Sequence, residues 1–272
     1  MDKIKILVTC HKPCNVYSDD VYIPIHVGRA NSKYKDEMAE MIGDNTGDNI
    51  SEKNPMYSEL TAHYWAWKNL HDVEYIGFCH YRRYFKYRFT KDNVDVLKDK
   101  DMMVLSYRFL TPIYHQIIKN IGWEDFTILL MVLKKKYPEY EQTMIKYLCG
   151  NTFNPKNMFV CKKTLFDKYA EWLFDILFEC EKHIKPSPYT RARRGMGYMG
   201  EFLLSVYIIH NHLSVKRTIY SDSRKKTFPA TIKVYIRKFL CLLHIKNANP
   251  KTLDAFYGSA ILDGLELDCI KI

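Results

Sequence analysis

The sequence contains no long hydrophobic run. No uninterrupted apolar stretch in its 272 residues approaches the roughly 18 residues that a membrane-spanning helix needs. The charged start at residues 1–5 leads into a short apolar segment that ends near Cys10, too short for a secretory signal peptide. The sequence therefore predicts a cytoplasmic protein. The alternative is a cytoplasmic protein that attaches peripherally to the inner face of the cell membrane.

Cysteine pairs at CxxC spacing are also missing. The sequence has eight cysteines and no CxxC pair, which argues against a zinc site and against a disulfide framework. We expect reduced cysteines, most of them in the hydrophobic core. They are Cys10, Cys14, Cys79, Cys149, Cys161, Cys180, Cys241 and Cys269.

A complete calcium loop is missing as well. Residues 43–51, GDNTGDNIS, carry acidic and amide side chains at turn spacing, but the glutamate that a calcium hand needs at its twelfth position is absent. Turns in which these side chains bond their own backbone explain the composition more simply. The alternative is contact with a sugar or nucleotide, for which Asp48 and Asn49 are the candidates. We expect no metal site here.

Positive charge and apolar residues, in contrast, are plentiful. The formal net charge is +10 and the hydrophobic fraction is 47%, with a sequence pI near 9.0. A chain of this length suits one α/β domain with an appendage, or two small domains. The excess positive charge implies an anionic partner, which is a nucleotide, a nucleic acid or a phospholipid surface.

The segment EYIGFCHYRRYF, residues 74–85, joins an apolar strand to a basic and aromatic cluster. Residues 75–79 are mostly strand formers, as in a strand buried on both faces of a mainly parallel sheet. Ligands of such sheets bind beyond the carboxyl ends of the strands. The side chains at that end suit a diphosphate and the ring of a base or sugar, unless the arginines pair with acidic groups and the tyrosines cover an edge. These candidate residues are His80, Tyr81, Arg82 and Arg83.

A first strand over residues 4–9 ends in a similar way. Thr9 closes it, and His11 and Lys12 follow, so these side chains are placed to contact a base or ribose. The alternative is a solvent-exposed turn. A helix expected over residues 54–70 leads into the strand described above, which gives the strand, loop, helix and strand of a parallel α/β half.

Later segments extend this α/β pattern. A strand over residues 101–105 is followed by polar and aromatic residues, and we expect His115 on the same rim as the basic cluster. Residues 117–147 have the apolar spacing of a helix. A short strand over residues 157–161 places Asn157 where its amide can bond sugar hydroxyls.

A glycine-rich stretch precedes one more candidate. Residues 195–200, GMGYMG, match GxGxxG, but no strand precedes them and no acidic residue follows about twenty positions later, so the dinucleotide fingerprint fails. A basic loop that includes Arg194 instead leads into a helix with Glu201 expected near its start. A partly buried carboxylate there can act as a general base. The alternative is an acidic residue that stabilises the helix N-terminus.

The C-terminal part is basic and amphipathic. Residues 222–246 combine lysines and arginines with apolar residues, which fits a helix on a membrane surface or one packed on the domain. We therefore divide the chain into a main domain, residues 1–220, and a C-terminal extension, residues 221–272, that associates with membrane.

Together these segments resemble a bacterial family that is described as a domain of unknown function and occurs in capsule, exopolysaccharide and O-antigen gene clusters. The resemblance covers residues 4 to about 210. It rests on the stretches GDNIS-x-KN, SELTAHYWAWKN, YIGFCHYRRYF, NMFVCKKTLFDKYAEWLFDIL and R-x-x-G-Y-x-GEFLL.

The resemblance implies a GT-A-like glycosyltransferase with a single Rossmann-like, mostly parallel α/β sheet flanked by helices. Some members are assigned as β-galactofuranosyltransferases that use UDP-galactofuranose. The implied reaction moves a sugar from a UDP-sugar to a lipid-linked glycan acceptor with inversion. Glu201 is then the expected base. Asn157, His115 and Arg194 are the candidates for contact with the acceptor or the sugar.

In one respect, the metal-binding motif, this sequence differs from most GT-A enzymes. Most GT-A enzymes carry an Asp-x-Asp metal motif after the strand that corresponds to residues 75–79, whereas this sequence has His80-Tyr81-Arg82. We infer that His80, Arg82 and Arg83 supply the counter-charge of the diphosphate. No metal cofactor is therefore expected, with manganese or magnesium as the alternative.

A second class of function competes with the enzyme. The net charge and the aromatic content also fit a non-enzymatic nucleic-acid-binding protein, which would bind RNA or DNA with a steep salt dependence. Such a protein is expected to spread its basic residues along a stripe, whereas here they gather at the ends of strands and loops. We therefore expect no nucleic-acid partner.

Overall fold

The computed structural model describes residues 2–189, 192–222 and 250–257. They form two compact units, which we describe separately. The first unit comprises the described parts of Met1–Ser106, Asn154–Trp172 and Leu213–Lys225, and the second those of Tyr107–Phe153, Leu173–His212 and Lys226–Ile272. Nearly all of the basic C-terminal segment expected to be a helix lies outside the described residues.

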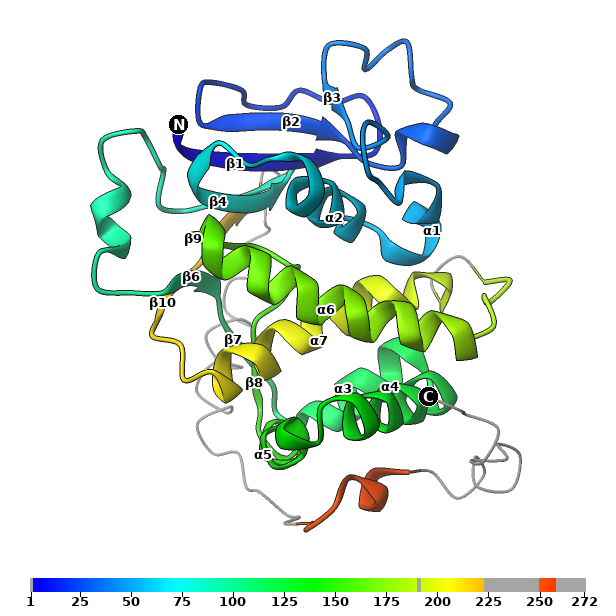
Figure 1. The fold of residues 1–272 in the computed structure, drawn as a ribbon. Coiled ribbons are helices and arrows are strands. Elements are labelled where there is room, and N and C mark those ends of the chain that lie inside the picture. Colours follow the sequence, from blue (N-terminus) through cyan, green and yellow to red (C-terminus); the bar gives the residue numbers. More distant parts are fainter. Residues whose placement is uncertain (1, 190–191, 223–249, 258–272) are drawn as a thin grey trace, which may run out of the picture. The chain divides into compact units, whose positions relative to one another are not determined.

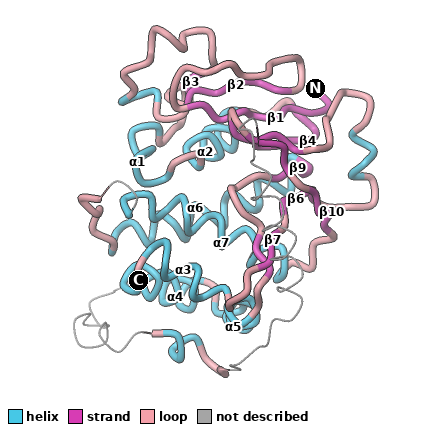
Figure 2. The backbone as a smooth tube through the Cα atoms, turned by 180° about the vertical axis from the view of Figure 1, so that it is seen from behind, coloured by secondary structure: helices cyan, strands magenta, loops and turns pink. Residues whose placement is uncertain are grey.

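The first unit is built on a mixed sheet in the order β10-β6-β9-β4-β1-β2-β3 (Figures 1 and 2). Neighbouring strands are parallel except that β9 runs antiparallel to both β4 and β6. This confirms the mostly parallel α/β sheet. The strands are β1 (Asp2–Cys10), β2 (Tyr22–His26), β3 (Ile42–Gly43), β4 (Val73–His80), β6 (Met102–Leu105), β9 (Phe159–Lys162) and β10 (Val215–Thr218), with β5 (Arg83–Phe85) and β11 (Tyr220–Asp222) paired beside β4.

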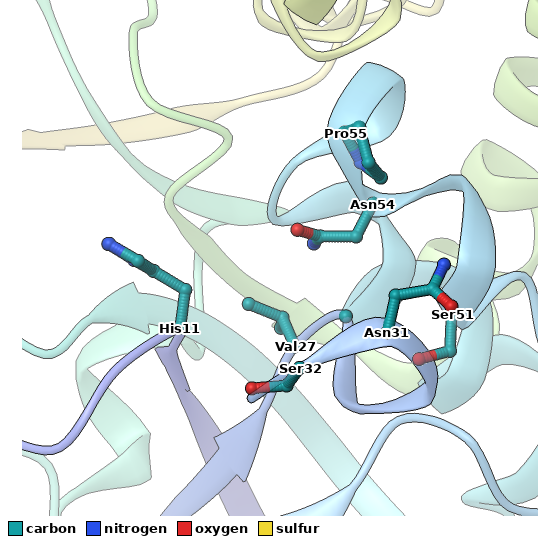
Figure 3. Close-up of a pocket in the computed structure, with 8 residues that line it drawn as sticks. His11, Val27, Asn31, Ser32, Ser51, Asn54 and Pro55 are labelled. Atoms are coloured by element: carbon teal, nitrogen blue, oxygen red, sulfur yellow. The ribbon is translucent and has the colours of Figure 1, made fainter. Parts of the chain in front are cut away.

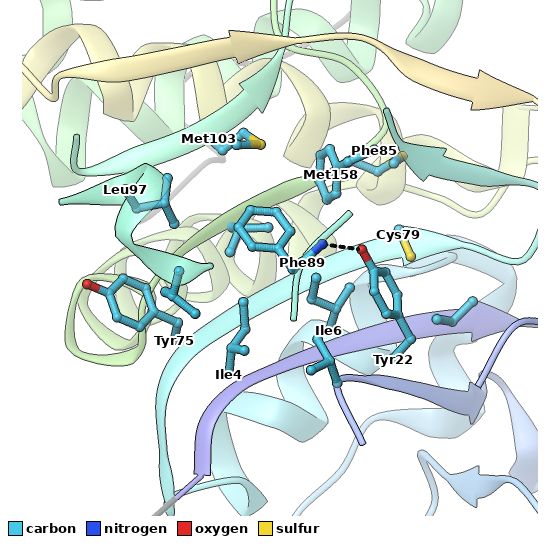
Figure 4. Packing of buried hydrophobic residues seen from close by; sticks show 14 of the residues in the cluster. Ile4, Ile6, Tyr22, Tyr75, Cys79, Phe85, Phe89, Leu97, Met103 and Met158 are labelled. Carbon is cyan, nitrogen blue, oxygen red and sulfur yellow. Dashed lines mark hydrogen bonds between the residues drawn. The ribbon is translucent and has the colours of Figure 1, made fainter. Parts of the chain in front are cut away.

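One face of this sheet is covered by the segment that follows β4. Because side chains alternate along a strand, every second residue of β1 and β4 points to this face and packs against β5 and the 3₁₀ helix η3 (Val94–Leu97). The Phe89 amide also donates a hydrogen bond of 3.1 Å to the Tyr22 hydroxyl (Figure 4). Buried members of this cluster include Ile4, Ile6, Tyr75, Cys79, Phe85, Leu97, Met103 and Met158.

The opposite face is covered by helices. Phe78 of β4 is fully buried and stacks on His63 of α2 (Leu60–Asn69) with 3.7 Å between ring centres. Phe159 of β9 and Phe166 of α6 (Lys163–His183) lie 5.3 and 5.1 Å from the same ring. These aromatic contacts fix the helices against the sheet.

The helix expected over residues 54–70 is in fact broken. The 3₁₀ helix η2 (Ser51–Lys53) and the short α1 (Asn54–Tyr57) precede Ser58, which has φ 53° and ψ −130°, and α2 begins at Leu60. The Asn54 amide donates 2.7 Å to the Ser58 carbonyl and holds this kink. Apolar spacing did not reveal the break because it depends on the backbone conformation of Ser58 and on the hydrogen bond from Asn54, which hydrophobicity does not report.

The second unit is mainly helical. The single helical stretch expected over residues 117–147 is three helices, α3 (Ile113–Ile121), α4 (Trp123–Lys136) and α5 (Glu141–Cys149). Gly122 at φ +88° separates the first two, and Pro138 starts the 3₁₀ helix η4 (Pro138–Tyr140) before the third. The strands β7 (Tyr107–Arg108) and β8 (Thr152–Phe153) pair here, and α7 (Gly195–His210), η5 (Ala192–Arg194) and η7 (Leu253–Phe256) complete the unit.

Two expectations about the whole chain can be compared with the described residues. The six cysteines among them are free thiols, and Cys14 is the only one of the six that is not buried. None of the helices in these ranges is long and apolar enough to cross a bilayer.

Candidate functional site

His80 lies at the centre of a polar cluster where β4 ends. Its Nε2 atom is 2.9 Å from the carbonyl oxygen of Lys156, and its Nδ1 atom is 3.3 Å from the Thr9 hydroxyl. β1 and β4 are parallel with Thr9 opposite His80, which explains why the last polar residues of both strands meet. The predicted residues Thr9 and His80 therefore lie side by side, and their contact with a nucleotide-sugar stays a prediction.

Tyr81, Arg82 and His11 continue the cluster. The Arg82 guanidinium lies 4.7 Å from the centre of the Tyr81 ring, and the His11 ring meets the same tyrosine edge-on at 5.4 Å. Burial raises the pKa of the Cys14 thiol, and the positive charges of Arg82 and Lys12 oppose that rise, so both cations lie near the same thiol.

Arg83 is held by a carboxylate. Its Nε atom lies 3.7 Å from Asp222 of β11, whose side chain is 4% exposed, while the Arg83 side chain is 28% exposed. The alternative interpretation, that an arginine of this cluster pairs with an acidic residue, therefore describes Arg83. Arg82 has no such ion pair among the described residues, and its guanidinium stacks on Tyr81 instead.

Glu59, which the sequence left open for contact with a ligand or, more simply, for packing, is a further member of this cluster. It stands directly before α2, is 8% exposed, and accepts a hydrogen bond of 2.9 Å from the Asn157 amide. Asn157, expected to bond sugar hydroxyls, is thus committed to this carboxylate by its amide nitrogen. Glu59 and Asn157 are 98 positions apart in the sequence, so only the folded structure reveals this pair.

A pocket of about 230 Å³ lies beside this cluster, at the ends of β1 and β2. Figure 3 shows His11 on one side of it, and Asn31, Ser51 and Asn54 on the other. His11 is the only one of the nine residues expected to bind nucleotide-sugar that lines this pocket. The lining residues are His11, Val27, Gly28, Asn31, Ser32, Ser51, Asn54 and Pro55.

Asp44 builds one wall of this pocket from behind. Its side chain is fully buried and accepts hydrogen bonds from the amides of Gly28 at 2.7 Å and Arg29 at 3.1 Å, and a further one from the Ser51 hydroxyl. The turn composition of residues 43–51 concealed this role, because two of the three partners, the amides of Gly28 and Arg29, belong to another segment.

Asp48 and Asn49 lie in the same loop but play a different part. Asp48 accepts a hydrogen bond of 3.1 Å from the Tyr64 hydroxyl, and Asn49 bonds the backbone of Gly47 and Ser51. The bonds of Asn49 are the local turn bonds of the simpler interpretation, whereas the bond of Asp48 reaches Tyr64 in α2. Contact with a nucleotide or sugar stays a prediction for both residues.

Comparison with known proteins adds a family. Residues 5–212 match the model of a domain of unknown function, DUF4422. The chain belongs to this family. It is also similar to the solved apo structure of WbbM, described as a bifunctional glycosyltransferase, with 30% sequence identity and a TM-score of 0.73. The similarity covers 83% of this chain and 46% of that one, so the chain spans less than half of the WbbM structure. No curated protein matches the sequence.

The remaining candidates of this DUF4422 chain belong to the second unit. Glu201 is not near a helix start, since α7 begins six residues earlier at Gly195, and the glycine-rich residues are helical. Glu201 is half-buried. Burial of the Tyr147 hydroxyl raises its pKa, and the negative charge of Glu201 raises that pKa further. A role at the helix N-terminus is therefore excluded for Glu201, and the role of general base stays a prediction.

His115 and Arg194 are surface residues of the second unit. His115, in α3, is exposed with its ring 4.0 Å from that of Tyr114. Arg194 directly precedes α7, and its guanidinium lies 5.6 Å from the Tyr198 ring centre. Their contact with an acceptor or sugar stays a prediction.

The side chains at the end of β4 are not the ligands that magnesium or calcium prefers. They are imidazole, phenol and guanidinium groups, whereas magnesium and calcium prefer carboxylate and carbonyl oxygens. Across the described residues, no group of three or more histidine, cysteine, aspartate or glutamate side chains is placed to hold a metal ion.

Proposed function

We propose that this DUF4422 chain is a glycosyltransferase that uses a UDP-sugar. The observation that carries the proposal is the similarity to WbbM, at 30% identity over 83% of the chain, because that protein is described as a glycosyltransferase. The polar cluster at the carboxyl ends of β1 and β4 supports it, because ligands of open α/β sheets bind at that edge.

The two parts of the site suit two parts of one donor. The pocket is lined by hydroxyl, amide and apolar groups, with His11 as its single titratable side chain. Such a lining suits the neutral base and ribose, and its volume is below the roughly 300 Å³ typical of a whole drug-sized ligand. The diphosphate then meets His80, Arg82 and Arg83 at the end of β4, in the role that a metal ion plays elsewhere.

The proposed reaction is a single displacement with inversion. The acceptor oxygen bonds to the anomeric carbon as the bond from that carbon to the diphosphate oxygen breaks, and the electron pair leaves with UDP. Glu201 takes the proton of the acceptor hydroxyl, and the cations near β4 stabilise the charge on UDP. Galactofuranose is the first sugar to test, and His115 and Arg194 are proposed to contact the acceptor.

The proposed acceptor is a lipid-linked glycan of capsule, exopolysaccharide or O-antigen synthesis. The protein then works at the inner face of the cell membrane, and we propose that the basic segment 222–246 attaches it there. Flotation with anionic vesicles, compared with neutral ones, tests this attachment.

A thermal-shift panel of UDP-, GDP-, dTDP- and CMP-sugars, with and without EDTA, tests the donor class and the need for metal together. A ligand at about 100 times its Kd stabilises the folded state by about 2.7 kcal/mol, which is readily measured. We expect stabilisation by UDP-sugars alone, unchanged by EDTA. If no sugar nucleotide stabilises the protein while RNA binds with a steep salt dependence, the nucleic-acid alternative is correct.

A further inference from the structure

Three residues with unusual backbone conformations surround His80 and Glu59. Ser58, Lys156 and Asn157 have φ of 53°, 72° and 49°, and they are three of the four non-glycine residues with positive φ in the described part of the chain. Such conformations are energetically unfavourable and persist where the surroundings enforce them, often at functional sites. Here Ser58 precedes Glu59, Lys156 supplies the carbonyl for His80, and Asn157 supplies the amide for Glu59.

The hydrogen bonds of His80 allow two protonation states without movement of heavy atoms. The Lys156 carbonyl only accepts, so Nε2 carries a proton in both states. In the neutral state, Nδ1 accepts from the Thr9 hydroxyl. In the charged state, Nδ1 donates to the same oxygen, and the Thr9 proton turns to the Cys79 carbonyl at 3.2 Å.

The groups around His80 lower its pKa, which favours the neutral state. Burial lowers this pKa, and the positive charges of Arg83 and Lys156 lower it further, whereas the Glu59 carboxylate and the hydrogen bond to the Lys156 carbonyl raise it. The fourth titratable neighbour, His63, is fully buried with its pKa lowered to about 3 and is neutral near pH 7. An anion that arrives beside Arg82 and Arg83 adds negative charge and shifts the balance towards the imidazolium.

We propose that Glu59 is a positioning residue for His80, and that His80 takes up a proton when a nucleoside diphosphate binds at the end of β4. The proposal rests on the proposed function and deepens it. The proton comes from solvent and adds to Nδ1, so that bound diphosphate gains one counter-charge. No bond other than the new N–H bond is formed. The Thr9 hydroxyl oxygen accepts a hydrogen bond from the new N–H group, and Glu59 stabilises the resulting cation.

Calorimetry of UDP binding in buffers of different ionisation enthalpy measures the protons taken up. We expect the wild-type protein to take up nearly one proton more than His80→Gln does, since this difference cancels any proton exchanged by UDP itself. His80→Gln is expected to bind UDP about tenfold more weakly, because the diphosphate loses the positive charge of the imidazolium. Thr9→Val removes the hydroxyl oxygen that accepts a hydrogen bond from the new N–H group, so it is expected to reduce the proton uptake. This variant replaces His80→Gln in the test if His80→Gln does not fold.

Glu59→Gln tests the positioning role, because it keeps the oxygen that accepts from Asn157 but removes the charge. NMR titration of labelled histidines should show a lower pKa of His80 in this variant, without any nucleotide present. Glu179→Gln is the matched control. Glu179 is also 8% exposed, but its partners are Lys182 and His183 in α6, so the pKa of His80 should not change.

The outcomes separate this inference from the proposed function. If UDP binds but the wild type and His80→Gln take up the same number of protons, the proton coupling is wrong while the transferase proposal stands. If Glu59→Gln leaves the pKa of His80 unchanged, the positioning role is wrong. Absence of any UDP binding contradicts the proposed function, whereas the NMR titration still decides whether Glu59 acts on His80.

Discussion

Replacement of Asp44 by asparagine tests how the pocket wall is built. The Asp44 carboxylate is fully buried and accepts from two backbone amides, at 2.7 and 3.1 Å, as well as from the Ser51 hydroxyl. Asparagine has nearly the same shape, so it leaves the packing intact. It keeps one oxygen for the Gly28 amide and places an NH₂ group against the amide of Arg29.

The expected cost follows from these bonds. A buried N–H group left without an acceptor costs about 1–3 kcal/mol, and hydrogen bonds to a charged acceptor are worth about 1.5–3 kcal/mol against about 1 kcal/mol for neutral ones. We therefore expect Asp44→Asn to lower the free energy of unfolding by about 3 kcal/mol. UDP should also bind more weakly, because Gly28 and Ser51 line the pocket.

Urea unfolding followed by tryptophan fluorescence measures the effect, because Trp65 donates 2.8 Å to Thr46 in the same loop. Asp48→Asn is the control. Asp48 is exposed with one side-chain bond to Tyr64, and surface changes of this kind are usually within about 0.5 kcal/mol. If the free energy of unfolding of Asp44→Asn lies within about 0.5 kcal/mol of that of Asp48→Asn, the carboxylate does not organise the wall and the reasoning is refuted.

Three further results are expected. Gly77→Ala should destabilise the protein by about 1–3 kcal/mol, because a Cβ there would meet Val160 at 2.8 Å and the Phe159 carbonyl at 3.2 Å; Gly195→Ala, whose Cβ would meet only Asp125 at 3.5 Å, should show no loss of melting temperature. His63→Phe should flatten the acid side of the stability profile. Burial lowers the pKa of His63 to about 3, against about 6.5 in the unfolded chain. The free energy of unfolding of the wild type therefore falls as pH drops from 6.5 towards 3, by up to about 1.4 kcal/mol per pH unit. If urea unfolding at pH 6.5 and 5.5 shows the same change in free energy of unfolding for the wild type and His63→Phe, His63 does not titrate this way. Glu201→Gln should lose UDP-sugar turnover and keep UDP affinity, and retained turnover would remove it as the base.

The strands were predictable because their signal is local. The apolar runs of β1, β4 and β6 are short and continuous, as in strands buried on both faces, and the structure places strands there. The position of β9 between β4 and β6, antiparallel to both, was not predictable. Apolar periodicity reports which residues are buried and carries no information about the direction of a neighbouring strand.

The place of the basic cluster in the fold was predictable for a similar reason. His80 ends β4, Tyr81 and Arg82 follow it directly, and residues at the carboxyl ends of parallel strands lie along one edge of the sheet. The sequence did not predict that Asp222 of β11 holds Arg83, because the two residues are 139 positions apart (222 − 83) and meet only through the pairing of β5 with β11.

The sequence by itself determined the α/β class, the strand that ends in a basic cluster, and the resemblance to a transferase family, because each depends on residues that are close along the chain. Only the tertiary structure decided that Asp44 supports the pocket and that Glu59 meets Asn157 near His80. The sequence shows that a carboxylate stands at a helix end or in a turn, but it does not show the hydrogen-bond partners of that carboxylate. Folding decides the partners, because it brings distant backbone amides and side chains within hydrogen-bonding distance.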